Sequence, residues 1–297
     1  MIRPIILYNA ENLAQLTQHQ ITAITENKST LLSYMIASYT NTTHQKNFKY
    51  ILGVKRNCSN LVTLGELGEF PLILNGYISL LSFWHRCSLM SDNTLVRQTL
   101  DLVKNDTYSS EWISTVKFLL SYLGMHEHFV DPSISNTETF KAKCRRKLGD
   151  NIIQEWETQI SGEEGKLRFY KQIKKSFKME PYLLHINNFT LRKVLTKFRG
   201  SDHTLEIEIG RHRKLEVTDR ICKICNNEVE TELHFLQSCP KYSKHRTRYL
   251  NTLNTHNWID MLQCNDKSVA YNVANFLDKA MKIRAETLTL PEYTTEP

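Results

Sequence analysis

The sequence predicts an all-α fold. Only 10 Gly and 7 Pro interrupt its 297 residues, which is too little turn-forming punctuation for a sandwich of short strands. Apolar residues instead recur at helical spacing, as at Ile73, Tyr77 and Leu80. With 41% hydrophobic and 23% charged residues, the composition is that of a globular chain rather than an extended disordered one.

The first half of the chain is expected to be helical throughout. Helices are expected over residues 11–27, 44–54, 60–67, 70–90, 95–105 and 110–123. Gly53 and Gly124 are suited to close two of them, and Ser59 is suited to cap the third. Residues 70–90 are apolar around much of the helix, which predicts a central buried element with Tyr77 and Trp84 in the core.

Positive charge is concentrated in the second half. Residues 1–140 hold 10 Lys and Arg against 11 Asp and Glu, whereas residues 141–297 hold 28 against 20. The turn-rich segment 131–137 predicts a boundary between a helical region, 1–131, and a basic helical region, 138–297. A basic half of this kind indicates a polyanionic partner.

Basic and apolar residues separate by helical phase in the segments expected beyond that boundary. Helices are expected from Phe140 to Trp156 and over residues 166–178, 188–200 and 267–286. Exposed basic faces on successive helices are typical of proteins that follow a phosphate backbone. The residues predicted to contact RNA or DNA are Arg168, Lys171, Lys174, Lys175, Arg192, Lys193, Lys197, Arg199, Arg211, Arg213, Lys214, Lys241 and Lys244.

A cluster of metal-binding residue types lies within residues 220–242. Cys222, Cys225, His234 and Cys239 follow the pattern C-x2-C-x8-H-x4-C. Three thiolates and one imidazole are the ligand set of a closed tetrahedral zinc site, so the sequence predicts a structural zinc. Four protein ligands leave no position for an activated water, so we expect no catalysis at this ion.

Two alternatives to this ligand set remain open. Chance clustering of core cysteines would give the same spacing without a metal, and His245 or Cys264 are candidates to replace one of the four ligands. With zinc bound, the three thiolates give the site a net charge of about −1. Neighbouring cations such as Lys223, Lys241 and Lys244 would offset that charge and favour the thiolates.

The remaining cysteines and the lack of sorting segments indicate an intracellular protein, nuclear or cytoplasmic. Cys58, Cys87, Cys144 and Cys264 are scattered and are expected to be reduced core thiols. The first residues lack the apolar stretch of an export signal. No run reaches the roughly 18 apolar residues of a membrane span, so no membrane partner is expected.

Residues 195–242 resemble the C-terminal zinc-knuckle region of LINE-type, non-LTR retrotransposon reverse transcriptases. The residues that carry the resemblance before the cysteine cluster are Phe198, Arg199, His203, Leu205, Ile207, Glu208, Gly210 and Arg211. Residues 50–72 are similar to the segment that follows the thumb in this family, and residues 3–11 to the start of the thumb. The Trp often found just after that start is absent here.

The resemblance implies a thumb-like helical half followed by a basic helical half that carries the CCHC zinc knuckle. It implies RNA or DNA as partner, gripped for a polymerase. A polymerase palm needs paired aspartates for two metal ions, and no two Asp residues are adjacent in this sequence. We therefore expect a non-enzymatic, nucleic-acid-binding C-terminal portion without a small-molecule substrate. The alternative is a zinc-stabilised protein-interaction scaffold with no nucleic-acid role.

Overall fold

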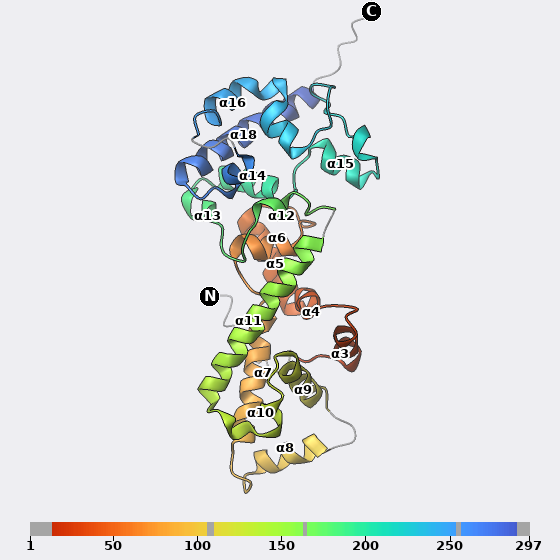
Figure 1. The fold of residues 1–297 in the computed structure, drawn as a ribbon, viewed down its shortest axis with the longest axis vertical. Helices are drawn as coiled ribbons and strands as arrows, with labels where there is room; N and C mark the ends of the chain where they lie inside the picture. Colours follow the sequence, from red (N-terminus) through yellow and green to blue (C-terminus); the bar gives the residue numbers. More distant parts are fainter. Residues whose placement is uncertain (1–13, 106–109, 163–164, 254–256, 290–297) are drawn as a thin grey trace, which may run out of the picture. The chain divides into compact units, whose positions relative to one another are not determined.

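The computed structural model describes residues 14–105, 110–162, 165–253 and 257–289. Within these residues every regular element is helical, and no strand is formed. Two isolated antiparallel bridges are present, Leu67 with Met179 and Ile221 with Val229. The all-α class predicted from the sequence is therefore confirmed (Figure 1).

The chain divides into two compact units. The first comprises Met1–Gln45 and Phe70–Gln159, and the second comprises Lys46–Glu69 and Ile160–Pro297. The boundary predicted at residues 131–137 is not where the chain divides, because this segment lies inside the first unit. It is held there on both sides: His85 Nε2 contacts the carbonyl of Pro132 at 3.0 Å, and His85 stacks on Phe140.

The helices of the first unit are α3 (Gln18–Thr25), α4 (Leu31–Ala37), α7 (Ile73–Ser88), α8 (Leu95–Asn105), α9 (Glu111–Tyr122), α10 (Glu127–Val130), the 3-10 turn η1 (Pro132–Ile134) and most of α11 (Thr137–Gly162). Helices α7, α8, α9 and α11 lie close to the bounds expected from the sequence, whereas α4, α10 and η1 were not predicted. Tyr77 and Trp84 on α7 are almost fully buried, which confirms this helix as a core element. Trp84 stacks on Phe129 at 5.6 Å. The helix predicted over 11–27 is shorter, and residues 3–11 of the resemblance lie outside the described residues.

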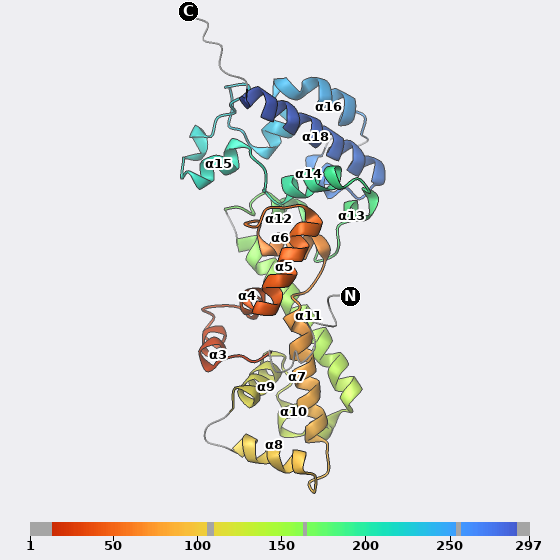
Figure 2. The ribbon, with the colours of Figure 1, turned by 180° about the vertical axis from the view of Figure 1, so that it is seen from behind.

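The second unit is built around α18. Its helices are α6 (Asn60–Leu67), α12 (Tyr170–Ile173), α13 (Tyr182–His185), α14 (Phe189–Arg199), α15 (Glu206–His212), α16 (Ser243–Tyr249), α17 (Trp258–Gln263) and α18 (Lys267–Thr289), together with the end of α5 (Tyr39–Leu52). Helix α18 packs on α13, α14, α16 and α17 (Figures 1 and 2). Val273, Phe276 and Leu277 form its buried face, as the amphipathic pattern predicts.

The helix predicted over residues 166–178 is wrong. Only α12, four residues long, is helical there, and the chain then turns so that Met179 pairs with Leu67. Lys174, the residue directly after α12, has a buried ammonium group that is bound to Glu180 and to the carbonyl of Lys178. A continuous helix would have placed this charge on the solvent side.

The four cysteines outside the cluster match the prediction from the sequence. Cys58, Cys87, Cys144 and Cys264 are free and buried, as expected of core thiols. Among the helices that the structure describes, none is long and apolar enough to cross a membrane.

Candidate metal centre

The first two cysteines of the cluster lie on a tight hairpin. Its arms are joined by the bridge between Ile221 and Val229 and by a hydrogen bond of 2.8 Å from Cys222 N to the Glu228 carbonyl. The turn closes at Asn226, whose amide donates to the Cys222 carbonyl at 2.8 Å and whose φ is +53°. Asn tolerates this left-handed conformation better than most residues do. The hairpin therefore presents Cys222 and Cys225 on one side of the site.

The other two candidate ligands come from the segment that follows. A π-helical turn, η3, spans His234–Ser238, and Cys239 comes directly after it. Thr231 Oγ1 accepts a hydrogen bond of 3.0 Å from His234 N and so caps this turn. Cys239 N donates to the His234 carbonyl at 2.9 Å, which fixes the spacing between the two ligands.

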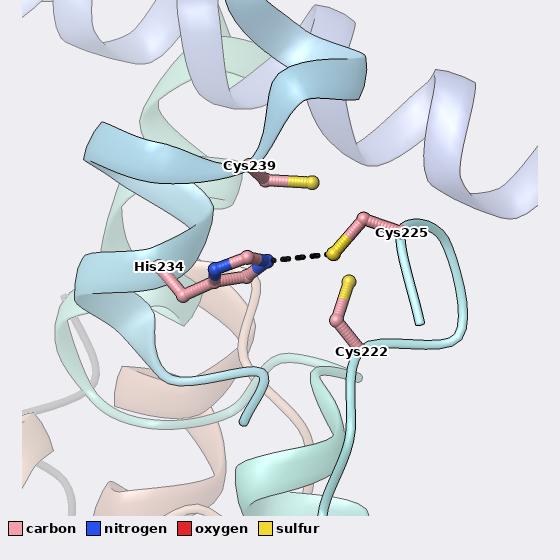
Figure 3. Close-up of side chains that lie close together, drawn as sticks. All are labelled: Cys222, Cys225, His234 and Cys239. Atoms are coloured by element: carbon pink, nitrogen blue, oxygen red, sulfur yellow. Dashed lines mark hydrogen bonds between the residues drawn. The ribbon is translucent and has the colours of Figure 1, made fainter. Parts of the chain in front are cut away.

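The four side chains converge on one point. One ligand atom from each of Cys222, Cys225, His234 and Cys239 lies within 4.8 Å of the others (Figure 3). Ligand atoms in a tetrahedral thiolate site are separated by roughly 3.5–3.8 Å, given metal–ligand distances of about 2.0–2.3 Å. The Cys225 Sγ to His234 Nε2 distance is 3.4 Å. These residues therefore lie close enough to bind a metal ion.

A carboxylate orients the histidine. Glu228 Oε2 lies 2.8 Å from His234 Nδ1, and because a carboxylate only accepts, Nδ1 carries the proton. The lone pair of Nε2 is then directed at the three sulfur atoms. Metal-binding histidines are commonly held in this way, with the distal ring nitrogen donating to a carboxylate. Glu228 has no role among the predictions from the sequence, since a carboxylate next to a cysteine pair has no distinctive spacing.

Backbone amides point at the sulfur atoms. Burial is the largest influence on Cys222 and raises its pKa to about 12, against the opposing effect of hydrogen bonds from the Cys225 and Ile224 backbone. At Cys225 burial acts in the same direction, but the backbone of Asn227 and the Cys222 side chain outweigh it, so the pKa is lowered. N–H groups that donate to sulfur favour the thiolate, which is the form that binds metals.

A buried ion pair supports the hairpin from behind. Glu230 is fully buried and receives two hydrogen bonds of 2.7 Å from Arg284 on α18. It also accepts from Glu206 N at 2.7 Å. Because Glu230 N donates to the Arg220 carbonyl, this network ties the hairpin to α15 and α18. Arg246 holds the π-helical turn by donating to the carbonyls of Leu236 and Cys239.

The two replacement ligands considered from the sequence do not join the cluster. In the described part of the chain, the group that can hold a metal consists of the four predicted residues. Cys264 Sγ instead donates to the Met261 carbonyl, and the His245 ring stacks against Tyr249.

The predicted nucleic-acid contacts divide by exposure. Exposed are Lys175, Arg213, Lys214, Lys241 and Lys244. Half-buried are Arg168, Lys171, Arg192, Lys193, Lys197 and Arg211. Buried are Lys174 and Arg199. The exposed face predicted for the last two is wrong, because both side chains turn inward to carboxylates.

Arg199 is the clearest correction. Its guanidinium is fully buried and contacts Glu66 Oε1 at 3.0 Å and Glu180 Oε2 at 2.6 Å. Lys174 completes the same network through Glu180. Arg168 is also compensated, since it pairs with Glu208 and, at 2.7 Å, with Glu232. These three side chains stabilise the fold rather than face a ligand.

Residues that carry the family resemblance also take part in the contacts around the hairpin. His203 Nε2 lies 3.3 Å from the buried carboxylate of Glu232. Gly210 leaves room for the Arg220 side chain, whose Cγ would lie 2.5 Å from an added Cβ. Arg220 in turn donates to the Ile207 and Leu215 carbonyls. The block before the cysteines therefore packs against the hairpin and orders the exposed loop 212–219.

Comparisons with protein-family models, with curated proteins and with solved structures find no match to this chain.

Proposed function

We propose that the cluster binds zinc and that the ion is structural. Three thiolates and one imidazole favour zinc among the common intracellular divalent ions. Cys222, Cys225, His234 and Cys239 would hold it, and the ion would supply the cross-link between the hairpin and the π-helical turn. All four positions of a tetrahedral ion are then filled by protein, which supports a structural rather than a catalytic role.

We further propose that this chain binds RNA or DNA through the cations next to the zinc loop. The observation that carries this proposal is the exposure of positive side chains on both flanks of the cluster. Arg213 and Lys214 are exposed in the ordered loop before it, and Lys241, Lys244 and Arg248 are exposed after it. In contrast to Arg199, these side chains face solvent, where phosphates are accessible.

The sequence resemblance points to the same role. A chain of this kind would act as the C-terminal, nucleic-acid-gripping portion of a LINE-type reverse transcriptase, with the polymerase chemistry supplied by another part of that enzyme. The support is the block 195–211, whose residues pack around the cysteine hairpin through Glu232, Glu230 and Arg220. The block 195–211 would then connect the polymerase part of such an enzyme to the cysteine hairpin.

Native mass spectrometry tests the metal. The wild-type chain should carry one zinc ion, and Cys222→Ser should lose it. Cys264→Ser serves as a matched control, since it makes the same chemical change at a cysteine that does not join the cluster and whose side chain donates to the Met261 carbonyl. An unmetallated wild-type protein would contradict the site.

Fluorescence anisotropy over a range of salt tests nucleic-acid binding. The zinc-loaded chain should bind labelled RNA or DNA with log K falling by roughly 0.7–0.9 per neutralised phosphate. Changing Lys241 and Lys244 together to Gln should flatten this slope by roughly 1.4–1.8. Failure to retain RNA or DNA at low salt would favour the protein-interaction scaffold instead.

A further inference from the structure

A second group of cations lies away from the cysteine hairpin, in the same compact unit. It consists of five lysines from four segments of the chain: Lys49 on α5, Lys55, Lys166, and Lys193 and Lys197 on α14. Three of them, Lys49, Lys55 and Lys166, had no place among the predicted contacts. Their spacing along the sequence gives no local pattern, because the fold alone brings them together.

Contacts between these segments define the cluster. The side chain of Lys193 lies against Gly53 at the end of α5, where an added Cβ would come within 2.7 Å of Lys193 Cγ. Gly53 has a φ of +67°, so this close approach and the left-handed turn both require glycine. Lys55 N donates to Asp202 Oδ2 at 2.7 Å, which brings the 53–57 loop to the end of α14.

Two of the lysines are held by neutral acceptors. Lys49 Nζ donates to the Arg56 carbonyl and Lys166 Nζ to the Asn57 carbonyl, each at 2.8 Å. A carbonyl fixes an ammonium group in place without cancelling its charge. Asp202 pairs with Lys55 at 3.8 Å, so five ammonium groups together with Asp202 retain four net positive charges.

Burial, and to a smaller extent neighbouring charges, lower the pKa of two lysines of the cluster. The pKa of Lys197 is lowered, first by burial and then by the charge of Lys193; Asp202 opposes this shift and Lys55 adds to it. The pKa of Lys49 is also lowered, first by burial, with Lys166 acting in the same direction and Cys58 and Asp202 opposing it. Gathering like charges opposes folding, and such arrangements are concentrated at functional sites. An external anion would relieve the repulsion.

Exposed aromatic side chains lie on the same helices as three of the lysines. Tyr50 is 83% exposed and directly follows Lys49 on α5. Phe189 is 46% exposed and lies one helical turn before Lys193, with Lys197 a further turn along the same face of α14. The Arg192 guanidinium lies over the Phe189 ring, 5.8 Å from its centre. Apolar rings of this size at a surface are suited to stacking on bases.

We propose that Lys49, Lys55, Lys166, Lys193 and Lys197, with Tyr50 and Phe189, form a binding surface for single-stranded nucleic acid. The lysines contact successive phosphates, and the two rings stack on bases that a duplex would keep paired and stacked. This inference rests on the proposed nucleic-acid function and gives it a second surface with a preference for single strands.

The lysines are tested by the salt dependence of binding. The probes are labelled single-stranded RNA and DNA of about 15 nucleotides and the duplex of the same sequence, with the zinc-loaded full chain. The variant Lys193→Gln/Lys197→Gln should reduce the single-strand slope of log K against log salt by about 1.4. The control variant Lys279→Gln/Lys282→Gln removes the same charge from exposed positions of α18 and should leave the slope unchanged.

The rings are tested by a second pair of variants. Tyr50→Leu and Phe189→Leu keep apolar bulk and should each weaken single-strand binding by about tenfold without changing the salt slope. Duplex binding should be unaffected. The RNA and DNA probes show which strand binds more tightly, and circular dichroism checks that each variant is folded.

Three outcomes would overturn this inference. The first is a single-strand slope unchanged by the Lys193 and Lys197 substitutions, and the second is an equal loss of duplex binding in the Tyr50 and Phe189 variants. The third is binding of the cluster to vesicles of anionic phospholipid but not to single strands. If wild-type protein binds duplex and single strands through Lys241 and Lys244 alone, the proposed function stands and this surface does not.

Discussion

Replacing Arg199 by methionine tests whether this residue belongs to the fold or to a ligand surface. Methionine fills a similar volume, but it leaves two carboxylates without their cation. Glu66 has a fully buried side chain, and that of Glu180 is 12% exposed. Arg199 also donates to the Leu262 carbonyl, which joins α14 to the end of α17. The substitution therefore removes contacts to three separate segments.

The expected loss is large. Removing one partner of a buried ion pair costs about 3–5 kcal/mol, because the other charge remains buried and unpaired. Lys174 stays beside Glu180 and limits the effect there. Among the described contacts, Glu66 has no second cation within hydrogen-bond distance. Tyr182 does donate a hydrogen bond of 2.6 Å to it. We therefore expect a loss of about 3 kcal/mol in the free energy of unfolding.

Urea unfolding of the zinc-loaded protein, followed by circular dichroism, measures this loss. Hydrogen exchange of α14 amides supplies a readout confined to the second unit. The double variant Arg199→Met/Glu66→Gln should be more stable than Arg199→Met alone, because it no longer buries an unpaired carboxylate. A loss below about 1 kcal/mol, together with a flatter salt slope for nucleic-acid binding, would show that Arg199 faces a ligand.

The same pair predicts a pH dependence. Burial alone would raise the pKa of Glu66, but the Arg199 guanidinium outweighs it and lowers the pKa below the ordinary 4.5. A carboxylate with a depressed pKa stabilises the fold above its unfolded pKa and loses this contribution as the pH falls through the folded value. In Arg199→Met burial raises the pKa of the unpaired Glu66 instead, so that variant regains stability as the pH falls toward about 4.5. The difference in stability between wild type and Arg199→Met should therefore begin to shrink above this pH and continue to shrink below it.

Three more substitutions or treatments have defined outcomes. Gly68→Ala should destabilise the second unit by about 1–3 kcal/mol in urea unfolding. The reason is that Gly68 has a φ of +60° and that an added Cβ would lie 2.4 Å from Met179 N. The control Gly162→Ala should not destabilise the unit, because the space around Gly162 is open. Glu228→Gln should weaken zinc binding about tenfold in competition with a chelating dye, at the low end of such effects because this side chain is 54% exposed. Removing the metal with EDTA should raise hydrogen exchange over residues 220–240 while α7 stays protected.

The candidate metal ligands could be predicted from sequence because their geometry is local. All four lie within eighteen residues, and a hairpin plus one helical turn is enough to bring them together. The groups that orient them are less visible. Glu228 lies between Cys225 and His234 in the sequence, but its contact with Nδ1 depends on the hairpin closing at Asn226.

The basic faces were only partly predictable. The sequence analysis groups Arg199 with the basic residues of α14, although its four-residue spacing from Leu195 places it at the edge of the apolar face. In the fold, Leu195, Phe198 and Arg199 are all buried, because α14 is enclosed on more than one side. The carboxylate that pairs with Arg199 is Glu66, 133 residues away. No periodicity within one helix reveals a partner at that separation.

The partners of the basic residues, rather than their number, decide what they do. Arg168, Arg199 and Arg284 each contact two carboxylate groups and are half-buried or buried. The planar guanidinium suits such multiple pairing. Lys49 and Lys166 are instead held by carbonyls and keep their charge. Substitution of these arginines should therefore change the stability of the second unit, whereas loss of lysine charge should change the salt dependence of binding.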